Sequence, residues 1–344
     1  MRVVIVGGGM AGLVLARGLV ARGLAPLVLE RSPATVVVRG PIMLPFQAFD
    51  PLEDIGLLRP IRAMGVDVPP FRNDEPVAVG VGRQPVLEML REGVETAWES
   101  DVVDLLHEGG RVAGCVVRGP GGAVREVAAD LVVGADGARS GVRVLAGIAA
   151  EVRPSPTVAL AWRSPRRPAE PFEIRFLADG RQLTMLDWPG GAAGGWQIPR
   201  PEGGAQEAMA PGVDAFRAAF ARLMPSAAGP LEELGPEGWF YREATEVSCE
   251  TWWVPGVALI GEALHAMDPE AGIGSGLGMG DAQALSIAIA RNPDDADAAC
   301  RDWEHWRRPA LAPYLAMGSA GVRVVRGGPS PPEERWPPEP EGAA

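Results

Sequence analysis

Lysine is missing from this chain of 344 residues, in which all 32 basic side chains are arginine. Its absence excludes every mechanism that needs a lysine amine. Cysteine and histidine are scarce, with three of each and no C-x-x-C pair. We therefore expect no metal, because a disulfide framework and a cysteine-based zinc site are excluded and little is left for metal ligation. The same scarcity of cysteine favours a reducing, cytoplasmic compartment.

Positive charge and long apolar runs are also limited. The formal net charge is −12, which argues against a nucleic-acid partner because phosphate binding needs clustered basic residues. No apolar run is long enough to cross a bilayer. The apolar start of the chain is broken by Gly7-Gly8-Gly9 and no cleavage site follows. We interpret it as a strand and a turn rather than a signal peptide.

The apolar pattern predicts two kinds of sheet. Continuous β-branched runs are typical of parallel strands buried on both faces; they occupy residues 2–6, 26–30, 129–133 and 257–260, with helices at 11–21 and 281–290. Further on, short alternating strands are predicted at 157–163, 172–177, 182–188 and 196–199, with a hairpin turn at 179–180 and a helix at 215–223. The fold class is therefore α/β: a Rossmann-like parallel sheet plus a second domain built on an antiparallel sheet.

The domain organisation is expected to be discontinuous. The first domain takes residues 1–66, 83–152 and 250–300, and the second takes 67–82 and 153–249. A C-terminal helical segment is expected at 301–326 and a disordered tail at 327–344, where proline, glutamate and glycine replace core-forming residues. Residues 31–64 predict a loop followed by a helix, and residues 68–75, rich in proline and charge, predict a segment that crosses between the domains.

The first motif that carries chemistry is Gly7-Gly8-Gly9-Met10-Ala11-Gly12, which stands between a predicted strand and a predicted helix. Gly7, Gly9 and Gly12 match the G-x-G-x-x-G pattern, in which glycines permit a tight turn, a close approach of a pyrophosphate and close helix–strand packing. Glu30 closes the next strand, where an acid accepts hydrogen bonds from adenosine ribose hydroxyls. An acid there also disfavours a 2′-phosphate, so this motif is not a site for NADP.

Two more segments follow in the same order as in a known family. Gly134-Ala135-Asp136-Gly137 leads to Arg139 and Arg143, and Gly261-Glu262-Ala263-Leu264-His265 leads to Pro269, Gly272 and Gly274. In order and spacing, the three segments resemble the aromatic-hydroxylase class of single-component flavoprotein monooxygenases, the para-hydroxybenzoate hydroxylase type. The resemblance runs through roughly residues 1 to 310 and is specific in the three motif segments.

The resemblance implies FAD as the cofactor and NAD(P)H as a transient co-substrate, since no second dinucleotide fingerprint is present. Asp136 and Gly137 would lie near the pyrophosphate, with Arg139 and Arg143 holding their loop. Other residues would contact the adenine, the ribityl chain or the isoalloxazine edge. The full implied cofactor set is Gly7, Gly9, Met10, Ala11, Gly12, Glu30, Arg31, Arg83, Val102, Asp136, Gly137, Arg139, Gly261, Glu262, Pro269, Gly272, Ile273 and Gly274.

The sequence departs from the family pattern at two of these positions. Glu262 stands where the family has Asp, and Ile273 stands where the family often has Gln. Both positions would contact the flavin, so these two changes would alter the affinity for FAD or the position of the flavin. The catalytic residues are not identified by sequence; His265, Trp188, Trp196 and Tyr241 are candidates for the pocket. A hydrogen-bonding structural role for His265, and core packing for the aromatic residues, are the alternatives.

The resemblance implies hydroxylation or epoxidation of a small aromatic or polyketide-like substrate, by a monomer or homodimer that uses NAD(P)H and O2. A non-redox cyclase, isomerase or binding protein on the same scaffold is the main alternative, supported by Glu262 and Ile273. A reductase or dehydrogenase would need no oxygen. A flavin-dependent halogenase is disfavoured because its chemistry needs a lysine, although Trp196-Gln197-Ile198-Pro199 matches the end of the halogenase signature.

Overall fold

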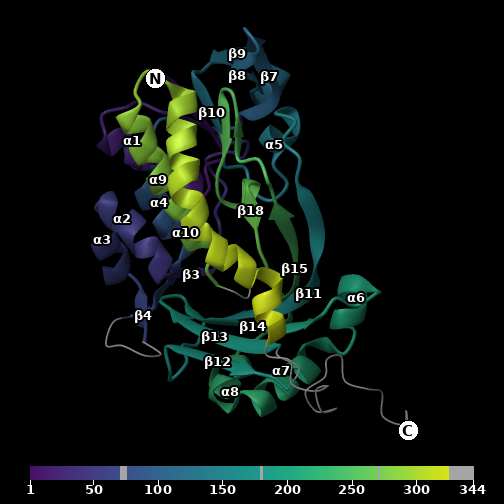
Figure 1. Cartoon of the computed structure of the whole chain (residues 1–344). Coiled ribbons are helices and arrows are strands. Elements are labelled where there is room, and N and C mark those ends of the chain that lie inside the picture. Colours follow the sequence, from purple (N-terminus) through teal and green to yellow (C-terminus); the bar gives the residue numbers. More distant parts are fainter. Residues whose placement is uncertain (70–75, 179–180, 270–271, 325–344) are drawn as a thin grey trace.

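The computed structural model describes residues 1–69, 76–178, 181–269 and 272–324, with side chains up to residue 316. The described chain forms two six-stranded sheets and two three-stranded sheets. One six-stranded sheet lies in the upper part of the molecule, with helices beside it, and the other lies below it (Figure 1). The predicted turn at 179–180 and the tail from residue 327 lie outside the described residues.

The upper sheet has the order β16-β17-β10-β1-β2-β6, and all of its pairs are parallel except β16 with β17. Its central strands β1, β10 and β17 are buried along their whole length, which explains their unbroken apolar sequences. The strands are β1 (Val3–Val6), β2 (Leu27–Leu29), β6 (Thr96–Ala97), β10 (Leu131–Gly134), β16 (Trp253–Val254) and β17 (Val257–Leu259).

Helices and two small sheets surround this parallel sheet. The helices are α1 (Met10–Ala21), α2 (Phe49–Asp54), α3 (Leu58–Ala63), α4 (Arg83–Arg91), α5 (Gly141–Leu145), α9 (Gly274–Arg291) and α10 (Ala296–Val324). One small sheet contains β3 (Pro41–Pro45), β5 (Ala78–Gly82) and β4 (Val66–Val68), and the other contains β7 (Asp101–Glu108), β8 (Arg111–Arg118) and β9 (Val124–Ala128). Strand β3 lies in the stretch that was predicted as a loop followed by a helix. It was not predicted because its apolar run is short and has a proline at each end.

The lower sheet is antiparallel and has the order β12-β13-β14-β11-β15-β18. Its strands are β11 (Glu151–Ser164), β12 (Phe172–Phe176), β13 (Gln182–Trp188), β14 (Gly191–Pro199), β15 (Trp239–Ser248) and β18 (His265–Ala266). Between β14 and β15 the chain forms α6 (Gly204–Met209), α7 (Gly212–Leu223) and α8 (Ala228–Glu232). Two layer types, a parallel sheet with helices and an antiparallel sheet with its own helices, confirm the predicted fold class.

Each six-stranded sheet has its own hydrophobic cluster. The cluster of the antiparallel sheet forms where alternate residues of β11, β13, β14 and β15 meet α7. There Trp162 packs edge-on against Phe220, with ring centroids 5.5 Å apart, and Trp239 stacks on Phe216 at 5.0 Å. The sheet therefore uses one face for its own core. Its opposite face, with Ala159, Ala161 and Gly195, is the open face.

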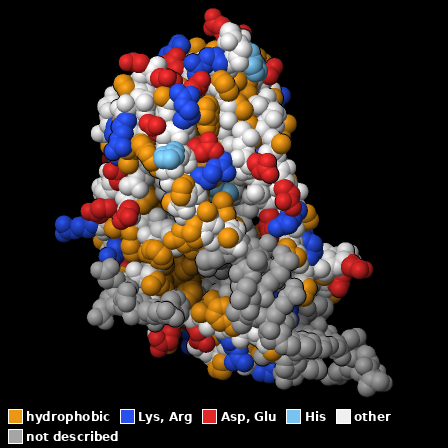
Figure 2. All heavy atoms as spheres, viewed as in Figure 1, with side chains coloured by type: hydrophobic (Ala, Val, Ile, Leu, Met, Phe, Trp, Pro, Cys, Tyr) orange, Lys and Arg blue, Asp and Glu red, His pale blue; other side chains and the backbone are white. Residues whose placement is uncertain are grey.

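Helix α10 runs down the molecule in front of both sheets (Figure 1). It is bound to the parallel-sheet part by polar contacts, among them Trp253 Nε1 to Glu304 Oε2 at 2.7 Å and Arg307 Nε to Asp281 Oδ1 at 2.7 Å. Acidic and basic side chains are interspersed over the face in view in Figure 2 rather than gathered by sign. No helix among the described residues is long and apolar enough to span a membrane.

The three cysteines are free and buried, and their thiols are expected to be inert in the folded protein. Burial raises the pKa of Cys115 to about 11 and that of Cys300 to about 12, and it also raises the pKa of Cys249. Because the thiolate is the reactive form, we expect no reaction of the native protein with dithiobis-nitrobenzoate at about pH 8, and reaction of all three thiols after denaturation. Rapid labelling of one thiol in the native protein would contradict this burial.

Candidate functional site

The glycine-rich turn between β1 and α1 has two positions that accept only glycine. Gly7 has φ +110°, and a Cβ there would lie 2.4 Å from the carbonyl oxygen of Ala135, in the loop after β10. A Cβ at Gly12 would lie 2.1 Å from the carbonyl oxygen of Gly7. The first motif therefore packs directly against the second. The first turn of α1 also packs against the glycine turn that precedes it.

Gly9 differs from its neighbours because the space beside it is open. A Cβ added there would meet no atom within 4 Å, although Gly9 has an ordinary extended backbone (φ −79°). Gly9 is the N-cap of α1, and no side chain caps the first turn, which begins with Met10 and Ala11. Free N–H groups at a helix start next to an open space suit a diphosphate, so this cradle fits the pyrophosphate of FAD.

Glu30 is held in a fixed orientation beside this turn. Its Oε2 accepts a hydrogen bond from the Gly8 N–H at 2.8 Å, and its Oε1 accepts one from the Ser32 N–H at 2.8 Å. Each carboxylate oxygen can still accept a second hydrogen bond, as binding of ribose hydroxyls requires. Arg31 is exposed next to it, and Val102 is half-buried on β7.

The second motif is organised by the Asp136 carboxylate. Its Oδ1 accepts from the Ser140 hydroxyl at 2.6 Å, and its Oδ2 accepts from the N–H groups of Gly141 at 2.7 Å and Val142 at 3.2 Å. Asp136 thus fixes the loop and the start of α5. Gly137 adopts φ +83°, a left-handed conformation that glycine adopts without strain.

Arg143 connects the second motif to the third. It is 5% exposed, and it donates to the carbonyl oxygens of Ala263 at 2.7 Å and Ala138 at 2.9 Å. Arg139 was expected to share this role, but the structure corrects that expectation. It is exposed and makes no hydrogen bond or ion pair with any residue that the structure describes. The position of the two arginines explains the difference, because Arg139 lies in the loop before α5, whereas Arg143 lies within α5 and is buried.

The third motif packs against the first and is held by a buried carboxylate. A Cβ at Gly261 would lie 3.2 Å from the Cβ of Ala11. The fully buried Asp281 of α9 accepts from the Gly261 N–H at 3.0 Å, from His265 Nε2 at 2.6 Å and from Arg307 Nε at 2.7 Å. Burial alone would raise the pKa of Asp281, but the adjacent His265 and Arg307 outweigh it and hold that pKa below its usual value. His265 therefore has the structural hydrogen bond that was one of its two predicted roles.

Arg83, at the start of α4, lies near Glu262 of the third motif, so α4 is a fourth segment that approaches the motifs. Burial, then the nearby Arg242, lower the pKa of Arg83, while Glu262 opposes them. The Nε of Arg83 is buried without a hydrogen-bond partner among the described residues. Glu262 Oε2 lies 4.0 Å from where a Gly137 Cβ would be. An unsatisfied buried donor needs an acceptor, and an oxygen of the FAD phosphate or ribityl chain fits it.

The predicted flavin-edge loop is described only in part, because residues 270–271 lie outside the described residues. Pro269 is exposed, and Gly272 has φ +65°. Ile273 packs against the main core and accepts the Leu277 N–H at 3.0 Å as Gly274 begins α9. The side chain of Ile273 is thus partly buried against the core.

The aromatic pocket candidates lie on different faces of the antiparallel sheet. Trp188 lines a cavity of about 530 Å³ together with Arg83 and Arg163. Trp196 is 0% exposed in the second core, and Tyr241 packs against that core. These two are therefore withdrawn as pocket candidates. The reason is the two-residue period of strands, which turns both side chains toward α7 and away from the open face.

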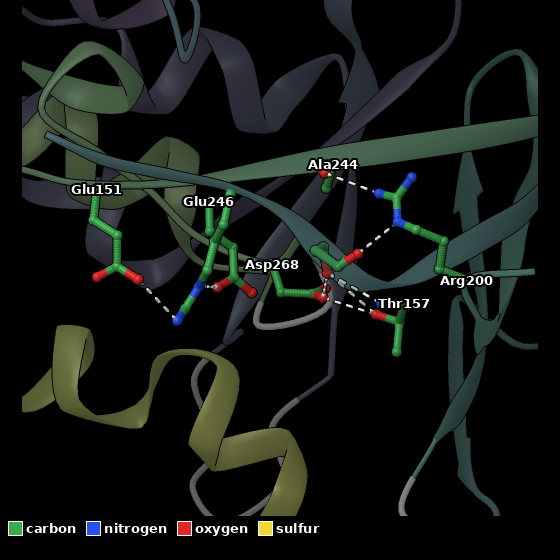
Figure 3. A network of polar contacts seen from close by, with 8 residues as sticks. Glu151, Thr157, Arg200, Ala244, Glu246 and Asp268 are labelled. Carbon is green, nitrogen blue, oxygen red and sulfur yellow. Dashed lines mark hydrogen bonds and ion pairs between the residues drawn. The ribbon is translucent and has the colours of Figure 1, made fainter. Parts of the chain in front are cut away.

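Several residues that position the site carry no motif of their own in the sequence. Arg307 and Arg242 were not singled out. Asp281 belongs to the third motif but was given no role, although a lone acid inside the apolar pattern of α9 indicates a buried partner. Asp268, 6% exposed, was also missed; its Oδ2 accepts from the Thr157 hydroxyl at 2.9 Å and from Ser155 (Figure 3). It precedes Pro269 directly, so it joins the flavin-edge loop to β11.

The fold and the three converging motifs define a flavoprotein, and comparisons with known proteins agree. The model of a family described as FAD binding domain matches residues 1–73 and 84–311. A kynurenine 3-monooxygenase of Salinispora tropica is 27% identical, over 94% of this chain and 80% of its own length. Two solved structures share the fold. One is a probable FAD-dependent monooxygenase, PqsL, from Pseudomonas aeruginosa, with 21% identity and a TM-score of 0.78 over 94% of this chain and 96% of that chain. The other is p-nitrophenol 4-monooxygenase from Pseudomonas putida, with 20% identity and a TM-score of 0.80 over 96% of this chain and 90% of that chain.

This chain belongs to the FAD binding domain family, as the match over most of its length shows. It is an FAD-dependent oxidoreductase of the monooxygenase class, in agreement with the resemblance drawn from its motifs.

Proposed function

We propose that this enzyme uses NAD(P)H and O2 to hydroxylate or epoxidise a small, electron-rich aromatic or polyketide-like substrate. In the overall reaction, one oxygen atom of O2 enters the substrate and the other leaves as water, and a hydride from NAD(P)H and a proton balance the charge. The observation that carries the proposal is a chain of contacts that brings the motif segments together. Gly261 packs against Ala11, and Glu262 lies beside Gly137 and Arg83. Two features suit a cofactor there: the open space at Gly9 and the unsatisfied Nε of Arg83.

The residues of this chain hold the cofactor and shape the groove around the substrate. When bound, FAD accepts the hydride and activates oxygen. The first turn of α1 would bind the pyrophosphate, Glu30 the adenosine ribose, and Arg83 and Glu262 the flavin-side phosphate or the ribityl chain. The open face of the antiparallel sheet lies next to this groove: Gly82 and Gly40, from the cofactor side, approach Trp188 and Arg163. That sheet would exclude water above the flavin.

Spectroscopy of the purified, FAD-loaded protein tests this proposal. We expect NAD(P)H to bleach the oxidised flavin absorbance in the absence of oxygen, and air to restore it. In the presence of a substrate, oxygen uptake should be matched by a product heavier by one oxygen atom. A flavin that stays oxidised with both NADH and NADPH would refute the proposal. If air reoxidises the flavin but none of the aromatics tested gains an oxygen atom, the protein is a reductase instead.

A further inference from the structure

Strand β12 is an edge strand of the antiparallel sheet. It pairs with β13 on one side, and no strand in the described part of the chain pairs with its other side. It lies near the lower end of the molecule (Figure 1). An edge strand presents a row of backbone N–H and C=O groups with which another chain can pair. Its last residue, Phe176, is 55% exposed, although a large apolar side chain on an open edge favours association.

The hydrogen-bond pattern of β12 shows which of its backbone groups point outward. Pro171, just before the strand, accepts a hydrogen bond from β13, and Leu177, just after it, donates one to the residue before β13. The register between the two strands is unbroken. Because the direction of the bonds alternates along an antiparallel pair, the odd-numbered residues bond toward β13. The N–H and C=O groups of Phe172, Ile174 and Phe176 therefore point away from β13.

The sequence of β12, Phe-Glu-Ile-Arg-Phe, is complementary to itself in the antiparallel direction. When a second copy of β12 lies alongside with Ile174 opposite Ile174, the outward groups of residues 172, 174 and 176 meet as hydrogen-bonded pairs. Phe172 then lies opposite the partner's Phe176. Glu173 lies opposite the partner's Arg175, once on each side of the centre. These charged residues form non-hydrogen-bonded pairs, in which opposite side chains are closest.

The neighbouring registers of such a pair are disfavoured. Since only the even-numbered residues bond outward, the second strand can shift only by two residues at a time. A shift in one direction places Glu173 opposite the partner's Glu173, and a shift in the other direction places Arg175 opposite the partner's Arg175. Like charges directly opposite each other are destabilising. The two charges of β12 therefore select a single register for a second copy.

The acid of this edge is oriented within its own chain. Leu177 is buried in the core of the antiparallel sheet, so Glu173 and Arg175, which share its face of the strand, lie on the side of that core. Glu173 Oε2 accepts a hydrogen bond from the Ser226 hydroxyl. A carboxylate can accept several hydrogen bonds, so Glu173 can also accept from the partner's Arg175. Arg175 itself is exposed and can reach across the edge.

We propose that β12 is the interface of a homodimer, in which two antiparallel sheets join into one continuous sheet across a two-fold axis at Ile174. The axis is perpendicular to the joined sheet, so the open faces of both copies lie on the same side. One pair of five-residue strands buries less area than a permanent dimer needs. The dimer is therefore reversible, with a dissociation constant on the order of 1–100 μM. The inference is independent of the proposed function.

Charge reversal at the paired positions tests the inference. Sedimentation equilibrium of the FAD-loaded protein, at roughly 1 to 500 μM, should show the wild type passing from monomer to dimer. Glu173→Arg and Arg175→Glu should each weaken self-association at least about tenfold, because like charges then face each other in both pairs. An equimolar mixture of the two variants should dimerise as the wild type does, because two arginines of one strand then face two glutamates of the other.

Further variants separate this interface from a general effect of charge or folding. Combining Glu173→Arg with Arg175→Glu in one chain exchanges the two charges and should recover the wild-type dimer. Arg125→Glu and Glu126→Arg, at exposed residues of β9, the edge strand of another sheet, are the matched controls and should leave the dimer unchanged. A wild type that stays monomeric up to about 500 μM, assembly beyond the dimer, single variants that associate like the wild type, or a mixture that stays monomeric would each overturn the inference.

Discussion

Replacement of Gly9 by alanine is expected to lower the affinity for FAD about tenfold or more, ~1.4 kcal/mol, while the apoprotein keeps its thermal stability. The added methyl group meets no protein atom within 4 Å, and φ at this residue is −79°. The substitution should therefore leave the folded structure and its stability unchanged. The methyl group would instead occupy the space through which the backbone approaches the pyrophosphate. Titration of the apoprotein with FAD, followed by flavin fluorescence, measures the loss.

Gly235→Ala is the matched control for this experiment. Gly235 also has a negative φ, −85°, and an added Cβ there also meets nothing within 4 Å. It precedes β15 and lies away from the three motifs, so its FAD affinity should equal that of the wild type. If Gly9→Ala binds FAD as tightly as Gly235→Ala does, the cofactor does not lie against the first turn.

Replacement of Asp281 by asparagine is expected to cost about 3 kcal/mol or more in the free energy of unfolding. An asparagine would present a donor amide to His265 or Arg307, both of which donate to the buried carboxylate. Arg307 is 15% exposed in its side chain, and it would lose its ion-pair partner inside the protein. Chemical denaturation measures the change. Asp67→Asn, which breaks the exposed pair with Arg62, should cost at most about 1 kcal/mol.

The pH dependence of this stabilisation has a definite sign. The folded-state pKa of Asp281 lies below its usual value, so its contribution is complete above the unfolded-state pKa near ~4 and is lost as the pH falls through the folded-state pKa. The stability difference between wild type and Asp281→Asn should therefore shrink only below about pH 4. A difference that already vanishes near neutral pH would contradict this assignment to Asp281.

Much of the parallel sheet could be predicted from sequence because its strands are buried on both faces. The runs at β1, β10 and β17 are apolar without interruption, and the glycine turn between β1 and α1 has a pattern that few other structures share. The matching acid, Glu30, lies at the end of β2 as expected. Local sequence was sufficient here because each of these features depends on residues close together in the chain.

The antiparallel sheet and the positioning residues could be predicted only in part, because the two faces of that sheet have different roles that the sequence does not distinguish. Trp196 and Gln197 are neighbours in β14, yet one belongs to the core of the sheet and the other to its open face. The alternation of these residues is visible in the sequence, but which face meets the cofactor depends on contacts such as Gly40 with Arg163. Asp281 and Arg307 likewise require the packing of α10 on α9, which no local pattern indicates.

The contact between Arg307 and Asp281 also bears on when FAD can bind during synthesis of the chain. Asp281 accepts a hydrogen bond from the Gly261 N–H, and Arg307, from the last helix of the described chain, donates to the same carboxylate. In addition, β1 pairs with β10, and β10 with β17. The glycine turn leaves the ribosome first, but its partners follow much later, at about 5–20 residues per second. FAD should therefore load only after translation of this helix is complete, so a nascent chain stalled before it should not retain the cofactor.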